Sequence, residues 1–245
     1  LCEKPVEVSL ENIMDIYRAA HKNKVIVMPG HTHRFYPENV MAKKIIDSGK
    51  IGDVVYIVDK INMLGLQAGY PQWMGKKVLS GGGILMNNGV HSIDRVQYWS
   101  GSLVDTITAR CGTYHFDIDV EDNGLMFMTL ENKATAFSEI SWSTPQPAGQ
   151  AVARILGTKG ALEIPAFMPV VKCALVGEKE WQEIKAEGEY GLTAELKEFA
   201  AAIKEEREPS VTPEMGFSAV AGVLAAYESN KTGLPVKLAR YPGIE

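Results

Sequence analysis

Apolar residues near the start of the chain recur first with helical spacing and then as a continuous run. Ser9 is a residue type favoured at helix N-caps. The apolar residues after it follow the i, i+3, i+4, i+7 spacing of an amphipathic helix: Leu10, Ile13, Ile16, Tyr17 and Ala20. The apolar run at 25–28, ended by Pro29 and Gly30, predicts a strand buried on both faces, as in a parallel sheet. A helix followed by such a strand is half of a β-α-β unit.

A second helix is expected to begin at Pro37, since proline suits the first helical position, and to end at Gly49. Its inward residues would be Val40, Met41, Ile45 and Ile46. Two helices are predicted late in the chain. The first has Leu192, Leu196, Phe199 and Ile203 on one apolar face, and the second runs from Pro213 to about residue 230, with Gly233 as its stop signal.

Beyond Gly52 the pattern changes to short runs rich in β-forming residues. These runs cover residues 54–58, 104–109, 124–130, 134–142, 153–156, 161–164 and 170–176. Short turns at 131–132 and 157–160 join consecutive runs, which indicates a mostly antiparallel sheet. The predicted class is therefore α+β: residues 1–31 form the last helix and strand of a doubly wound α/β domain, and residues 32–245 form an open, mostly antiparallel sheet with flanking helices.

Composition excludes several classes of protein. Of the 245 residues, 46% are hydrophobic and 22% are charged, and the net charge is −5. A mildly acidic chain without a Lys/Arg block has no electrostatic footprint for nucleic acid or anionic membranes. No apolar run approaches the roughly 18 to 20 residues that span a bilayer. Three widely spaced cysteines, Cys2, Cys111 and Cys173, favour a reducing, cytoplasmic location. Because residue 1 is Leu, we expect the chain to begin within a longer protein.

Two stretches could carry chemistry. Three glycines at 81–83 precede a predicted helix on which Asn87, His91 and Asp94 would share one face, an arrangement typical of a pocket floor. A lone histidine on such a helix is nevertheless more often a structural residue. Lys4 would sit at the carboxyl end of a parallel strand, where open α/β sheets place their ligands, although a short Glu-Lys-Pro segment can also be a solvated turn.

Taken in order, these motifs resemble the glucose-fructose oxidoreductase, inositol dehydrogenase and rhizopine catabolism (Gfo/Idh/MocA) family. The resemblance rests on Glu-Lys-Pro at 3–5, His-Arg-Phe-Tyr-Pro at 33–37, Ile-Gly-Asp-Val at 51–54, Gly-Gly-Gly at 81–83, the Gly-x-His-x-x-Asp pattern at 89–94, Ala-Tyr-Glu-Ser at 226–229 and Thr-Gly-Leu-Pro-Val at 232–236. It implies an N-terminal Rossmann domain, a C-terminal α/β domain whose open sheet often makes the subunit interface, and hydride transfer between NAD or NADP and a sugar, polyol or related hydroxyl.

The resemblance also implies roles for individual residues. Lys4 matches the lysine that contacts substrate and nicotinamide, with Glu3 and Pro5 beside the cofactor, and His91 matches the histidine that exchanges the hydroxyl proton. Asn87 departs from the family, which usually has Asp there. An amide can bind a hydroxyl but supplies no negative charge. The other substrate-contacting residues expected from the resemblance are Asp94, Trp73 and Arg34.

No Gly-x-Gly-x-x-Gly fingerprint occurs in the chain, since the third glycine after Gly81 and Gly83 would fall on Met86. We therefore expect the segments that bind the rest of the dinucleotide to lie outside it. His31, His33, His115 and Asp117 could suggest a metal, but their spacing is not that of a metal site, and none is predicted.

The leading hypothesis is an NAD(P)-dependent oxidoreductase acting on a small sugar- or polyol-like substrate, active only with its nucleotide domain. We expect a homo-oligomer that pairs through the open sheet. Two alternatives stay open: a relative that uses NAD in a redox-assisted elimination or glycoside cleavage, and a non-catalytic sugar- or nucleotide-sensing relative in which Asn87 marks lost catalysis.

Overall fold

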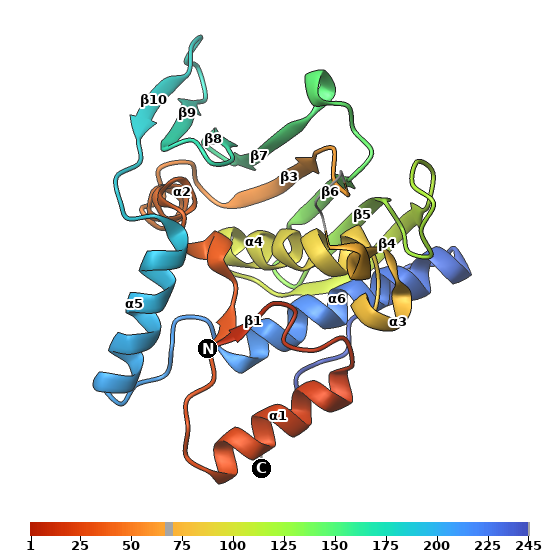
Figure 1. The fold of residues 1–245 in the computed structure, drawn as a ribbon. Helices are drawn as coiled ribbons and strands as arrows, with labels where there is room; N and C mark the ends of the chain where they lie inside the picture. The colour runs from red at the N-terminus through yellow and green to blue at the C-terminus, as the bar shows by residue number, and fades with distance from the viewer. Residues whose placement is uncertain (67–70, 245) are drawn as a thin grey trace.

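A nine-stranded sheet dominates the computed structural model, which describes residues 1–66 and 71–244 (Figure 1). Its strand order is β10-β9-β8-β7-β3-β6-β5-β4-β11. The strands are β3 (Val54–Asn62), β4 (Val104–Gly112), β5 (Asn123–Leu130), β6 (Thr135–Ser141), β7 (Gln150–Gly157), β8 (Gly160–Pro165), β9 (Val170–Leu175), β10 (Gln182–Lys185) and β11 (Val236–Lys237). All neighbours are antiparallel except β3 and β6, which pair in parallel. The predicted α+β class and mostly antiparallel sheet are confirmed.

Helices cover one face of this sheet. The helices are α1 (Leu10–Lys22), α2 (Pro37–Asp47), α3 (Lys77–Ser80), α4 (Val90–Ser100), α5 (Gly191–Lys204) and α6 (Pro213–Thr232), with 3-10 turns η1 (Thr32–Phe35), η2 (Gln72–Gly75) and η4 (Gln146–Ala148) and a π-turn η3 (Leu85–Gly89). Figure 1 shows α4 and α6 along the sheet, and α1 outside them. α6 contacts both β4 and α1, so it forms the middle of the core.

The local signals for helix ends are confirmed. The Ser9 side chain accepts a hydrogen bond from the backbone N–H of Asn12 and so caps α1. Pro37 opens α2, and Gly233 ends α6 with a φ of 76°, in the left-handed region that favours glycine.

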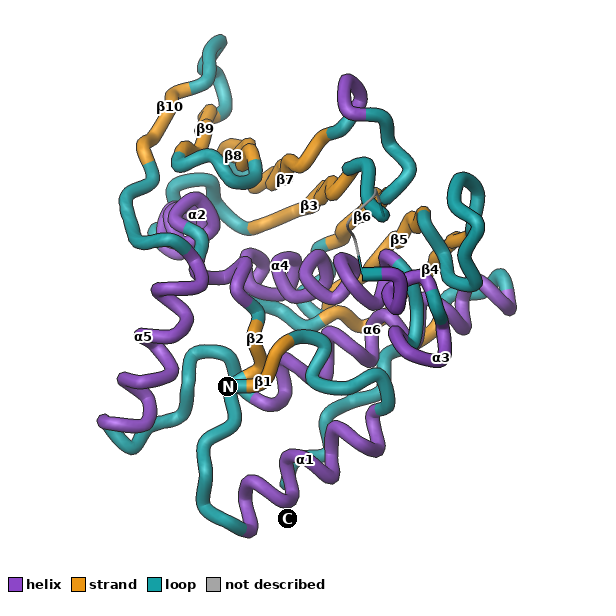
Figure 2. Tube along the Cα trace, in the orientation of Figure 1, coloured by secondary structure: helices purple, strands orange, loops and turns teal. Residues whose placement is uncertain are grey.

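A second, two-stranded sheet lies below α4, where β1 (Cys2–Glu3) pairs in parallel with β2 (Pro29–Gly30) (Figure 2). The strand predicted at 25–28 is wrong, because those residues are not in a strand and Val25 is 58% exposed. Only Met28 of that run is fully buried, and its carbonyl accepts from the Cys2 N–H. Regular strand pairing is therefore limited to Pro29 and Gly30, which pair with β1.

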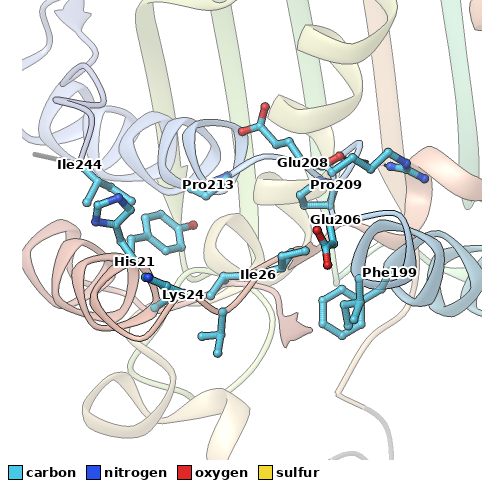
Figure 3. Close-up of a pocket in the computed structure, with 15 residues that line it drawn as sticks. His21, Lys24, Ile26, Phe199, Glu206, Glu208, Pro209, Pro213 and Ile244 are labelled. Carbon is cyan, nitrogen blue, oxygen red and sulfur yellow. Dashed lines mark hydrogen bonds between the residues drawn. The ribbon is translucent and has the colours of Figure 1, made fainter.

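The helix predicted from Leu192 to Ile203 is confirmed as α5, but its apolar side is not buried in the core. Leu192, Leu196 and Ile203 are each at least 43% exposed, whereas Glu195 and Ala202, which flank that apolar side, are fully buried. Helix α5 stands away from the sheet and packs on η1, where Glu195 Oε2 accepts a hydrogen bond from Thr32 Oγ1. Its apolar side instead borders an open groove, which we call the α1–α5 groove (Figure 3). The groove is lined by the apolar side chains of Tyr17, residues 25–27, Phe199, Ile203, Pro209 and Ile244, and also by the charged or polar side chains of His21, Lys24, Glu206, Arg207 and Glu208 (Figure 3).

The sheet face opposite the helices is divided into two parts. On the β7–β9 side, Arg154 and Lys172 both form ion pairs with Glu163, so this part is charged. On the β5–β6 side, Phe127 lies directly opposite Phe137. Phe127 is 48% exposed and the neighbouring Leu125 is 45% exposed. The second part therefore carries an apolar patch, which we call the β5–β6 face and define by Leu125, Phe127 and Phe137; Arg110 and Glu139 lie beside Leu125 on the neighbouring strands.

Candidate active site

Helix α4 carries His91 and is fixed by two buried ion pairs formed by adjacent residues. Asp94 accepts three hydrogen bonds of 2.7–2.9 Å from Arg34 of η1. Arg95 donates to both carboxylate oxygens of Asp59 on β3, at 2.7 Å. All four of these side chains are at most 7% exposed. One pair ties the helix to η1 and the other ties it to the sheet, so the position and rotation of α4 are set from two sides.

The glycine segment before α4 approaches its own chain rather than a phosphate. A Cβ on Gly83 would lie 1.9 Å from the carbonyl oxygen of Glu121, so only glycine can stand there. The Glu121 carboxylate accepts from the N–H groups of Gly83 and Leu85, at 3.0 Å, and from the Tyr227 hydroxyl at 2.8 Å. Glu121 thus holds the start of the helical segment that leads to His91.

The acidic residues Asp117, Asp119, Glu121 and Asp122 are expected from the sequence to form a solvated loop between strands, and the structure corrects this expectation for two of them. Asp117 and Asp119 are exposed, but Glu121 and Asp122 are buried. Burial raises the pKa of Asp122, but hydrogen bonds from the N–H groups of His115, Phe116 and Tyr114 outweigh it, and the pKa is lowered overall. The Asp122 carboxylate accepts bonds from N–H groups of its own loop, and the Glu121 carboxylate accepts them from the glycine segment, so neither faces water. Sequence periodicity gave no signal for this role.

A π-turn brings Lys4 to the segment before α4. Residues 85–89 form π-type rather than α-type turns, and such turns are common at functional sites. The Nζ of Lys4, which follows β1, donates a 2.8 Å hydrogen bond to the main-chain carbonyl of Asn87. Burial is the main cause that lowers the pKa of Lys4, to about 8, while the nearby Glu3 opposes the shift. The two stretches singled out in the sequence therefore meet in space.

Three histidine rings converge at the start of α4. The ring of His33 stacks on that of His91 with centroids 3.8 Å apart and an interplanar angle of 5°. The ring of His31 lies edge-on to His91 at 6.3 Å. In the described residues, the Nδ1 atoms of His31, His33 and His91 are buried without a hydrogen-bond partner. His31 and His33 were seen in the sequence only as a weak metal pattern, and their stacking partner lies too far along the chain for spacing to reveal it.

Burial keeps His91 uncharged near neutral pH. Desolvation is the main cause that holds the pKa of His91 well below its ordinary 6.5, and the positive charges of Lys4 and Arg95 act in the same direction. In this arrangement the neutral imidazole can accept a proton, while the lysine ammonium can donate a hydrogen bond.

The remaining predicted site residues lie in different surroundings. Arg34 and Asp94 bond to one another and are buried. Trp73 lies on η2 and is 51% exposed, Glu3 is exposed on β1, and Pro5 is half-buried. His115 and Asp117 lie on an exposed loop. Within residues 1–66 and 71–244, no three His, Cys, Asp or Glu side chains are arranged to hold a metal ion.

A known family model matches this chain over residues 40–163, just over half of its 245 residues, and that model describes the GFO/IDH/MocA C-terminal domain. The chain belongs to the GFO/IDH/MocA family. The matched residues include the π-turn, His91 and most of the large sheet. Lys4 and the small sheet precede the matched range.

Relatives of this GFO/IDH/MocA chain include oxidoreductases and a hydratase. An uncharacterized oxidoreductase of Streptococcus pneumoniae is 28% identical over 171 residues, 68% of this chain and 45% of the relative. A 2,7-anhydro-N-acetylneuraminate hydratase of Escherichia coli is 29% identical over 166 residues, 66% of this chain and 44% of the relative. The matched part thus spans less than half the length of these curated relatives.

Solved structures share the fold over nearly the whole chain. An aldose-aldose oxidoreductase from Caulobacter crescentus superposes with a TM-score of 0.87 at 26% identity, covering 97% of this chain and 71% of that one. A levoglucosan dehydrogenase solved with NADH and levoglucosan gives a TM-score of 0.88 at 20% identity, covering 98% of this chain and 73% of that one, which shows the fold alone.

Proposed function

We propose that this chain is the substrate-binding part of an NAD(P)-dependent oxidoreductase that acts on a hydroxyl of a sugar, polyol or related small molecule. The observation that carries the proposal is the meeting of the Lys4 ammonium and the neutral His91 around Asn87. Sugar dehydrogenases among the relatives support the substrate class: a D-apiose dehydrogenase of Rhizobium rhizogenes is 24% identical over 67% of this chain. A levoglucosan dehydrogenase of the same fold was solved with NADH.

Residues of this chain suit one end of the cofactor and the substrate. The uncharged His91 imidazole and the Lys4 ammonium are the two polar groups to which we assign contact with a small hydroxyl compound. We assign the side of the nicotinamide to Glu3, Lys4 and Pro5 beside β1. NAD or NADP, when bound, supplies the acceptor of the hydride.

In the proposed reaction, His91 accepts the hydroxyl proton while the carbon of that hydroxyl loses its hydride and the C–O bond becomes a carbonyl. We assign the proton to Nε2, because Nδ1 of His91 is fully buried. The Lys4 ammonium donates a hydrogen bond to the same oxygen and stabilises the negative charge that develops there. Asn87 contributes an amide that can bind a neighbouring hydroxyl. Arg34 and Asp94, being buried against one another, hold η1 to α4 and so place His91.

The α1–α5 groove supports a further part of this proposal. Its apolar lining, with Val25 and Ile203 each more than half exposed, is the kind of surface that another folded segment covers. We propose that the remainder of a nucleotide-binding domain packs here, next to the β1–β2 sheet. With three free cysteines, the protein would work in a reducing compartment such as the cytoplasm. Among the described residues, no helix has the length and apolar character to cross a membrane.

A protein that joins this chain to a complete nucleotide-binding domain is expected to reduce NAD⁺ or NADP⁺ in the presence of one class of sugar or polyol. Absorbance at 340 nm measures this reduction of the cofactor. It is followed with both cofactors over a panel of aldoses, polyols, anhydrosugars and sugar acids. The proposal would be contradicted if calorimetry showed that compounds of the panel bind to the protein while the cofactor was never reduced.

Asn87 favours one second candidate. Without a carboxylate at 87, the imidazolium formed on His91 has less support, which suits a reaction that returns its proton and hydride within one turnover. A redox-assisted elimination or hydration is of this kind, and hydratases are among the relatives. Substrate conversion with no net NADH, detected by chromatography of the products, would select this candidate over the dehydrogenase.

The β5–β6 face predicts self-association. An apolar sheet surface that includes Leu125 and Phe127 tends to pair with a second copy. Multi-angle light scattering is expected to give a mass of at least a dimer, and Phe127→Glu should shift it toward the monomer. Arg154→Ala, on the charged part of the same sheet face, is the matched control and should leave the mass unchanged. A monomeric wild-type chain at high concentration would overturn this prediction.

A further inference from the structure

His33 is held in one orientation by the groups around it. Its ring lies flat on His91, with centroids 3.8 Å apart. Tyr36 packs against it at 5.4 Å, and Phe167 meets it edge-on at 6.1 Å with an interplanar angle of 90°. The main-chain carbonyl of His33 accepts a 2.6 Å hydrogen bond from the Asn39 amide. Both the backbone and the ring of His33 are therefore fixed.

We infer that His33 is a positioning residue for His91: its flat ring fixes the plane of the His91 imidazole and excludes water from one side of it. This inference rests on the proposed function only for the role of His91 as the base. The stacked contact itself exists in the chain whatever reaction the protein carries out.

The hydrogen bonds of His91 explain why a stacking partner is needed. A catalytic imidazole is usually oriented through a bond from one ring nitrogen to a carboxylate or carbonyl. Among the described residues, Nδ1 of His91 has no such partner. The nearest carboxylate on the same helix, Asp94, has both oxygens bonded to Arg34, and position 87 carries an amide. With no hydrogen bond to Nδ1, the parallel ring of His33 is the contact that defines the imidazole plane.

The same contact controls the environment in which His91 titrates. The groups that face it are His31 and His33 from the η1 side, Lys4 from the β1 side and Arg95 on its own helix. Asp94 is paired with Arg34 and Asp59 with Arg95, so neither of these carboxylates is free to pair with His91. Desolvation is the first cause of the lowered pKa of His91, and His33 supplies part of the covering that excludes water. Removing the ring should hydrate His91 and raise its pKa.

Two variants separate the flat ring from the imidazole nitrogens. In NMR titrations of the 245-residue chain with ¹³C-labelled histidine, His33→Ala is expected to raise the pKa of His91 by about one unit. His33→Phe keeps a flat ring without nitrogens and should leave the pKa of His91 well below its ordinary value. His115→Ala, on an exposed loop, is the matched control and should change nothing. If His33→Ala fails to fold, His33→Ser replaces it.

The inference is overturned if His91 titrates alike in the wild type, His33→Ala and His33→Phe, or if the Phe variant raises its pKa as much as the Ala variant. The first result would mean that the stack is irrelevant, and the second that the nitrogens rather than the ring matter. In the complete enzyme, the acid limb of kcat/KM should move to higher pH with His33→Ala and stay in place with His33→Phe. If the NMR titrations give the expected pKa shifts but the complete protein shows no turnover, only the proposed function is contradicted and the inference about His33 stands.

Discussion

Replacing His91 by Ala should lower turnover by about 10²-fold or more in a protein with a complete nucleotide-binding domain, because proton transfer by a positioned base is worth roughly 10² to 10⁴-fold. Affinity for NAD(P) should stay nearly unchanged, since the imidazole acts on the substrate hydroxyl and not on the dinucleotide phosphates. Steady-state kinetics of cofactor reduction, together with calorimetry of cofactor binding, measure the two effects separately.

The pH profile adds an independent check on the same pair of groups. His91 is the active base when neutral, and its pKa lies well below 6.5, so activity should fall only on the acid side of that value. Lys4 is active when charged, and its pKa is about 8, so activity should also fall as the pH rises through 8. Lys4→Met should remove the alkaline limb and raise KM as well as lower kcat, because the ammonium holds the hydroxyl before and during hydride transfer.

His115→Ala is the control for this experiment, because His115 lies on an exposed loop. It should leave both kcat and the pH profile as in the wild type. Full turnover in His91→Ala with a verified substrate would remove His91 from the mechanism and favour a chain that binds its ligand without acting on it.

Asp94→Asn is expected to destabilise the fold by about 3–5 kcal/mol. The reason is that the substitution leaves the guanidinium of Arg34, only 7% exposed, without its counter-charge, and a buried ion pair that loses one partner costs this much. The loss should appear in the free energy of unfolding from denaturant titration at constant pH. His91 should also become less ordered, because Asp94 ties its helix to η1.

Asp15→Asn provides the matched comparison. Asp15 forms an ion pair with Arg18 on α1, but both side chains are at least 60% exposed, so the loss should stay below about 1 kcal/mol. Replacing both buried partners, in Arg34→Met with Asp94→Leu, should recover much of the stability, because no buried charge remains. Equal effects of Asp94→Asn and Asp15→Asn would show that the buried pair does not hold α4.

Local signals in the sequence predicted much of the fold. Ser9, Pro37 and Gly233 act through hydrogen bonds and dihedral angles within a few residues, so their helix ends can be inferred from neighbours alone. Alternating patterns and short turns likewise located the hairpins of β5–β6 and β7–β8. The family resemblance implied that Lys4 and His91 act on the same substrate, although no local pattern links residues so far apart; the hydrogen bond from Lys4 to Asn87 was not predicted.

Features set by tertiary contacts were not predictable in the same way. The spacing of Leu192, Leu196, Phe199 and Ile203 predicted α5 but not its surroundings, which depend on distant contacts such as the hydrogen bond from Thr32 to Glu195. The run at 25–28 has strand composition, yet it is not part of either sheet in the described part of the chain, and it stays irregular. The roles of Glu121 and His33 were not predicted, because their partners come from distant parts of the chain. These partners are the N–H groups of Gly83 and Leu85 for Glu121 and the ring of His91 for His33.

The hydrogen bond from Lys4 ends on the backbone of Asn87 rather than on its side chain. Every residue type carries that carbonyl, so the lysine keeps its anchor whatever side chain stands at 87. An exchange there can alter the charge or hydrogen-bonding groups offered to a ligand while the ammonium stays where it is. Substitutions at this single position can therefore change which ligands bind, in laboratory or natural evolution. No second substitution is needed to keep Lys4 in place.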